Sequence, residues 1–197
     1  MNRTWNQRDD GMTINIALLR GINVGGHNKI KMAELKSMFQ SMGFERVQTY
    51  IQSGNVLFTS TEDAESLRKR IEHEIEKVFS ISVTVVIRTS EELEQIIENC
   101  PFSEEVRKEA QASKQVETFY VSMLLQSPSQ ERIELLKEFA SEMDEYHVQD
   151  REVYLLLREG VRNSKLANNL FKLNVPSTVR NWKTINKLHT LVKSMEA

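Results

Sequence analysis

The order of strand-like and helix-like segments constrains the fold of this chain more than any other feature of its sequence. In the first half, apolar and β-branched runs alternate with segments whose apolar residues recur at helical spacing. These segments are a strand over 13–19, a helix over 31–42, strands over 46–51 and 56–59, a helix starting at 61 or 62, and a strand over 83–88. This β-α-β-β-α-β order is typical of the ferredoxin-like, split βαβ domain.

The second half repeats that order less regularly. The pattern predicts, in chain order, a helix over 91–99, a strand over 118–125, a helix over 129–142, paired strands over 145–148 and 152–157, and a helix over 165–173. Pro176, Ser177 and Thr178 have the residue types that cap a helix, and we expect a last helix from there to about Met195. The fourth strand of this half is then missing or replaced by the C-terminal helix.

The predicted fold class is therefore α+β, with two ferredoxin-like halves, antiparallel sheets, and an irregular second half that carries an extra C-terminal helix. Residues 1–12 are polar and lack a period, and we interpret them as a flexible N-terminal extension. We assign 13–99 to a ferredoxin-like domain and 100–197 to a second α+β domain with the C-terminal helix.

Composition limits the classes of partner. The net charge is −2, so whole-molecule electrostatics do not require a nucleic acid. From Arg162 onward, however, only Glu196 opposes the basic side chains, which indicates a solvated basic helix face or an anion-binding face. Cys100 is the only cysteine, which excludes internal disulfides and thiolate zinc clusters. The sequence has no long apolar run and no signal-peptide pattern, so we expect a cytoplasmic protein that does not enter the membrane.

A glycine-rich stretch, ALLRGINVGGHNKIKM over 17–32, follows the first strand and precedes the first helix. Its spacing fits neither a Walker-type phosphate loop nor the Gly-x-Gly-x-x-Gly dinucleotide fingerprint. The chemistry of anion binding is nevertheless present, because flexible backbone, a guanidinium and an ammonium group occur near a helix N-terminus. The candidate residues are Arg20, Asn23, Gly25, Gly26 and Lys29. The alternative is an ordinary polar strand-to-helix connection.

A second polar turn, formed by Gln52, Ser53, Gly54 and Asn55, joins the second and third strands. In a split βαβ fold the third strand lies between the first and second, so this turn is expected beside the end of the first strand. Convergence of two polar, glycine-bearing loops is typical of a small-ligand site. Turn chemistry alone would also explain Gly54 and Asn55.

A third stretch, TVRNWKT over 178–184, contains Arg180 and Asn181, which we expect to close the site from the other half. We place Arg180 in the first turn of the last helix, where a cation opposes the helix dipole and needs a carboxylate or a bound anion. Trp182 falls on the apolar face of that helix and is interpreted as a core residue.

These stretches resemble a bacterial family, domain-of-unknown-function family 1697. The matching motifs are RGINVGG over 20–26, KMAEL over 31–35, YIQSGNV over 50–56 and TVRNWKT over 178–184. The similarity covers nearly everything after Met12. It implies an α+β fold of ferredoxin-like halves and supplies no reaction.

Three functions remain open at this point. The preferred hypothesis is a module that binds a small phosphate- or carboxylate-bearing ligand at the glycine-rich loop. The second is an enzyme of unknown reaction that uses the same pocket, with His27 or Lys29 as the proton-transfer group. The third is a protein that binds nucleic acid through its basic C-terminal helix. No motif for a metal or another cofactor is present, so none is predicted.

Overall fold

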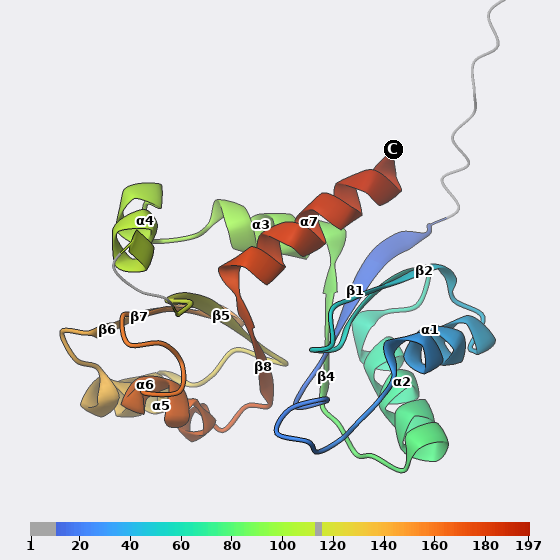
Figure 1. Ribbon diagram of the computed structural model, residues 1–197, viewed down its shortest axis with the longest axis horizontal. Helices are drawn as coiled ribbons and strands as arrows, with labels where there is room; N and C mark the ends of the chain where they lie inside the picture. The colour runs from blue at the N-terminus through green and yellow to red at the C-terminus, as the bar shows by residue number, and fades with distance from the viewer. Residues whose placement is uncertain (1–10, 113–115) are drawn as a thin grey trace, which may run out of the picture.

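The computed structural model describes residues 11–112 and 116–197 (Figure 1). The predicted flexible extension over 1–12 lies outside the described residues except for Gly11 and Met12.

The first half is a ferredoxin-like unit in the predicted order. Its elements are β1 (Thr13–Leu19), α1 (Met32–Ser41), β2 (Glu45–Tyr50), β3 (Asn55–Ser60), α2 (Ala64–Phe79) and β4 (Val85–Thr89). The strands form one sheet in the order β2-β3-β1-β4, with every neighbouring pair antiparallel. Because β3 separates β1 from β2, those two strands run in the same direction, as the sequence predicts.

The second half has the same topology. Its elements are α3 (Ser90–Glu98), α4 (Glu104–Ala112), β5 (Phe119–Leu124), α5 (Gln130–Leu136), the 3-10 helix η1 (Lys137–Phe139), β6 (Asp144–Gln149), β7 (Glu152–Leu157), α6 (Lys165–Asn168), the 3-10 helix η2 (Leu170–Leu173), β8 (Ser177–Asn181) and α7 (Trp182–Glu196). Its sheet order, β6-β7-β5-β8, repeats that of the first sheet strand for strand. The α+β class with two antiparallel sheets and a C-terminal helix is confirmed.

One part of the prediction for this half is wrong, because the fourth strand is present as β8. Its residues alternate between half-buried and buried, and it pairs with β5 in the register Ser122↔Val179. The helix α7 begins only at Trp182, because the side chain of Asn181 caps the backbone N–H of Thr184. Pro176, Ser177 and Thr178 belong to the strand and its approach, so Arg180 is a strand residue and not a first-turn helix residue.

Other boundaries in the second half also differ from the prediction. The helix expected over 129–142 ends as an α-helix at Leu136 and continues only as η1, after which Ala140 is extended. The helix expected over 165–173 divides into the short helices α6 and η2. The sequence pattern did not predict α4, which has Ala110 as its only buried residue.

Apolar side chains form three packed layers. One lies between the first sheet and the helices α1 and α2, and another lies between the second sheet and the helices α5, α6 and η2. The third joins the inner faces of both sheets with α3 and α7, and includes Leu18, Val121 and Leu188. In Figure 1 α3 and α7 lie together across the middle of the molecule, and β4 and β8 lie beside each other below them. The two sheets therefore share one core.

Candidate ligand groove between the two halves

A groove of about 880 Å³ runs along the contact between the two halves, where the end of β1 faces the segment that leads into β8. The first half contributes Arg20, Gly21, Ile22, Val24, Ser53 and Thr84 to its lining. The second half contributes Ala167, Asn168, Leu170, Phe171 and residues 174–180. The volume is typical of a small-molecule site. The described lining residues include two arginines and no carboxylate.

Arg180 ties the two halves together at the floor of this groove. It is 7% exposed, and its Nε donates to Asn55 Oδ1 at 2.7 Å. Its Nη2 donates to the carbonyl oxygens of Leu19 and Ser53, each at 2.8 Å, and to that of Gly54 at 3.2 Å. Its Nη1 donates to Thr178 Oγ1 at 2.7 Å and to the carbonyl of Val179 at 2.9 Å. All of its donors are thus used within the protein.

These partners are all neutral, so the positive charge of Arg180 is not compensated by a carboxylate among the described residues. Burial lowers the pKa of the Arg180 guanidinium to about 10, which leaves it charged at neutral pH. The predicted need for a counter-charge is met in part by oriented carbonyl dipoles. The charge itself has no ion-pair partner among the described residues.

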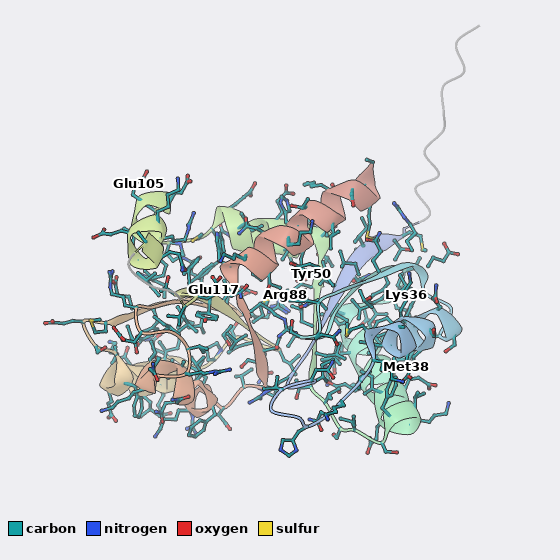
Figure 2. All side chains as sticks on the ribbon, viewed as in Figure 1. Lys36, Met38, Tyr50, Arg88, Glu105 and Glu117 are labelled. Atoms are coloured by element: carbon teal, nitrogen blue, oxygen red, sulfur yellow. The ribbon has the colours of Figure 1, made fainter. Side chains whose placement is uncertain are left out.

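Arg88 occupies the equivalent place in the first half and lies near the middle of the molecule in Figure 2. It is 1% exposed and donates to the carbonyl of Leu124, the residue equivalent to Leu19, at 2.7 Å. Its Nε also donates to Glu152, the residue equivalent to Asn55, at 3.0 Å. Burial lowers the pKa of Arg88 and raises that of Glu152. The two halves therefore build the same arginine link, and only the first-half arginine is paired with a carboxylate.

The glycine-rich loop is held in one conformation by its own hydrogen bonds. The side chain of Asn23 accepts from Ile30 N and donates to the carbonyls of Ile30 and Gln52, at 2.9–3.0 Å. Gly25 and Gly26 both have positive φ and form the centre of a turn closed by the bond from His27 N to Val24 O. Positive φ at both central residues is what a type I′ turn requires. Turn geometry thus accounts for this glycine pair.

The two polar loops meet, as the strand order predicts. Asn23 bonds to Gln52, and the N–H of Leu19 donates to the carbonyl of Gly54 at 2.8 Å. Gly54 has a φ of +80°, and a Cβ atom there would lie 2.8–2.9 Å from Ile22 and Leu19 side-chain atoms. The contact between the loops therefore requires glycine at this position.

The predicted site residues fall into separate groups. Arg20, Ser53 and Arg180 line the groove. A second hollow, beside the N-terminus of α1, is lined by Asn23, Gly26, Lys29 and Gln52. The amide side chains of Asn55 and Asn181 bond within the protein, Asn55 to Tyr50, Ser53 and Arg180, and Asn181 to the first turn of α7. Gly25 lines neither hollow.

Several groove residues were not predicted from the sequence. Asn168, Phe171, Asn174 and Ser177 come from the irregular segment before β8, and their place in the groove depends on that strand being present. The sequence STVR over 177–180 has no alternation of apolar and polar residues, and its cap-like residue types favoured a helix N-terminus, so the strand was missed.

The groups required by the two alternative functions lie elsewhere. His27 is exposed at the loop tip and does not line the groove, and Lys29 lines the second hollow. On the C-terminal helix, Lys183 pairs with Glu117, and Lys193 pairs with Glu94 and Glu196. The basic side chains of that helix therefore do not form a continuous unpaired face.

Within the described residues, no cluster of His, Cys, Asp or Glu could hold a metal ion. None of the helices in the described ranges has the length and apolar character needed to cross a membrane.

The fold and groove define a class: an α+β protein of two tandem ferredoxin-like units joined through buried arginines. The chain belongs to the family described as protein of unknown function DUF1697, which matches residues 12–154. A conserved bacterial protein from Streptococcus pneumoniae has a similar solved structure, with a TM-score of 0.68 and 22% sequence identity. That similarity covers 91% of this chain and 98% of the other, and it concerns the fold. No curated protein matches the sequence.

Proposed function

We propose that this protein binds a small anionic ligand, bearing a phosphate or a carboxylate, in the groove between its two halves. The observation that carries the proposal is the charge of Arg180, which is buried at the groove floor without a carboxylate partner among the described residues. A buried charge without a counter-ion is energetically costly, and an anion in the groove would offset that cost.

In this proposal the two arginines have different roles. Arg20 is exposed at the groove, and its side chain makes no hydrogen bond or ion pair with the other described residues, so its guanidinium can contact the anion directly. Arg180 acts through its electrostatic field, because its donors are already used. Ser53 and Ser177 add hydroxyl groups that can complete the hydrogen bonds of a phosphate or carboxylate.

The same lining favours binding over proton-transfer catalysis. Among the described residues, the groove is lined by no histidine, lysine, carboxylate, cysteine or tyrosine. Those side chains are the usual general acids and bases of enzymes.

The proposal is tested by calorimetric titration with inorganic phosphate, ribose 5-phosphate and citrate. We expect at least one to bind the native protein, and Arg20→Ala to weaken that binding about tenfold or more through loss of a charge-assisted contact. Arg20→Lys should retain part of the affinity, because it keeps the charge and loses the planar fork.

Arg162→Ala provides the matched control, since Arg162 is exposed and does not line the groove. Its affinities should equal those of the native protein. Equal weakening by Arg162→Ala and Arg20→Ala, or binding unaffected by Arg20→Ala, would reject the proposal.

A further inference from the structure

The groove contains the two most exposed large hydrophobic side chains of the described residues. Phe171 is 67% exposed and Val24 is 63% exposed, and both line this groove. They come from different halves, Val24 from the glycine-rich loop and Phe171 from η2. Exposed apolar side chains that gather in one concave site mark a binding surface more often than isolated ones do.

Local structure fixes Phe171 at the groove. Its neighbours Leu170 and Leu173 are buried in the core of the second half, and they anchor η2. The 3-10 helix ends at Asn174, which has a left-handed conformation. Phe171 itself contacts no other aromatic ring among the described residues. An aromatic face is thus presented by a well-anchored element and left uncovered.

The chemistry of the groove therefore has two parts. Arg20 and Arg180 provide positive charge, while Phe171 and Val24 provide apolar surface. The amide groups of Asn168 and Asn174 also line the groove and can donate and accept hydrogen bonds at the edge of a heterocycle.

From this combination we infer that the ligand is an anion joined to a planar heteroaromatic ring, of the nucleoside monophosphate class. The ring stacks on Phe171 and packs against Val24, and the phosphate lies toward Arg20 and the charge of Arg180. Stacking on an aromatic side chain tolerates different bases, because each base has a π face. This inference rests on the proposed anion binding and adds the ring.

The test compares the ring with its non-aromatic counterpart. AMP, GMP, CMP and UMP are titrated calorimetrically beside ribose 5-phosphate, which has the same sugar and phosphate without a base. We expect at least one nucleotide to bind about tenfold more tightly than ribose 5-phosphate. Phe171→Ala should remove that gain and leave ribose 5-phosphate binding unchanged, whereas Phe171→Trp should keep the gain.

Val78→Ala serves as the control for a general effect of truncating an exposed apolar side chain. Val78 is 49% exposed on α2 and does not line the groove, so this variant should keep the nucleotide gain. The inference is overturned if no nucleotide binds more tightly than ribose 5-phosphate, or if the gain persists in Phe171→Ala. A third result would also overturn the inference: the native protein self-associates, Phe171→Ala abolishes that self-association, and no nucleotide binds more tightly than ribose 5-phosphate. The exposed Phe171 would then belong to a protein interface. The proposed anion binding is tested separately. If Arg20→Ala loses ribose 5-phosphate binding, the proposed function is supported even where the inference about the ring is overturned.

Discussion

Arg88 and Arg180 occupy the same position in the two repeats, and they differ in the side chain that accepts the hydrogen bond from Nε. Glu152 meets Arg88 and Asn55 meets Arg180, and both contacts are hydrogen bonds of 3.0 Å or less. Replacing a carboxylate by an amide keeps an acceptor for the guanidinium and leaves its charge without a counter-ion. This difference leaves Arg180 without an ion-pair partner among the described residues, and with Arg20 it accounts for the positive charge of the groove.

Arg180 is a structural link between the two halves. Arg180→Met keeps the apolar stem and removes every donor, so the amide oxygen of Asn55 and the buried carbonyl of Leu19 lose a partner. We expect the free energy of unfolding to fall by about 3 kcal/mol in urea titrations. Arg158→Ala, which breaks a half-exposed ion pair with Glu145, should cost less than about 1 kcal/mol. Equal losses in the two variants would contradict the structural role of Arg180.

The sequence predicts a need for compensation at Arg180 from a position in the first turn of a helix, but Arg180 lies in β8. Its hydrogen-bond partners could not be predicted from the sequence. Four of its six partners are main-chain carbonyls, three of them from the other half, and main-chain groups have no residue type that a sequence pattern can display. The same reason hides the role of Asn23, whose side chain bonds entirely to the backbone. Residue type indicated the candidate positions, and only the fold showed that Arg20, Ser53 and Arg180 are the ones that line the groove.

At the level of elements, the first half was predicted almost completely and the second half was not. In the first half β1, β3 and β4 contain apolar runs, and both faces of β1 are buried, which explains its loss of alternation. The strand β8 has five residues and includes a buried arginine and a buried threonine, so it lacks a hydrophobic signal. Tertiary pairing with β5 decides its conformation.

We expect the stability of the fold to depend on pH through Glu152, the first residue of β7. Burial raises the pKa of Glu152 at the start of β7, although Arg88 lies beside it. A raised pKa in the folded state means that the folded protein holds this proton more tightly than the unfolded chain does. The contribution of protonated Glu152 to the free energy of unfolding is complete below the pKa of glutamate in the unfolded chain, which is about 4.3. It is lost as pH rises through the pKa of Glu152 in the folded protein.

The free energy of unfolding of the native protein, measured relative to Glu152→Gln, should therefore decrease as pH rises from about 4. Thermal or urea unfolding of both proteins over pH 4–8 checks this difference, and groups common to both cancel. A difference that increases with pH would show that the ion pair with Arg88 outweighs the burial of Glu152.

At the scale of the whole molecule, the groove exists because two similar units are packed through one shared core. The layer between the sheets contains side chains from both halves and from α3 and α7, and each half sends one buried arginine into the other. The predicted domain boundary between residues 99 and 100 stays a prediction. The helix α3 precedes that boundary in the chain and packs in the layer that both halves share. The sequence showed the repeat, and the packing of one repeat on the other required the structure.

The central claim is that an anion binds in the groove between the halves and not in the hollow beside α1. The most direct measurement is a titration of ¹⁵N-labelled protein with ribose 5-phosphate, followed by the shifts of backbone amide signals. We predict saturable shifts for Gly21, Ser53 and Ser177, which line the groove, and little change for Gly26 and Lys31, which line the hollow beside α1. Shifts confined to Gly26 and Lys31, or no saturable shift at all, would contradict the claim.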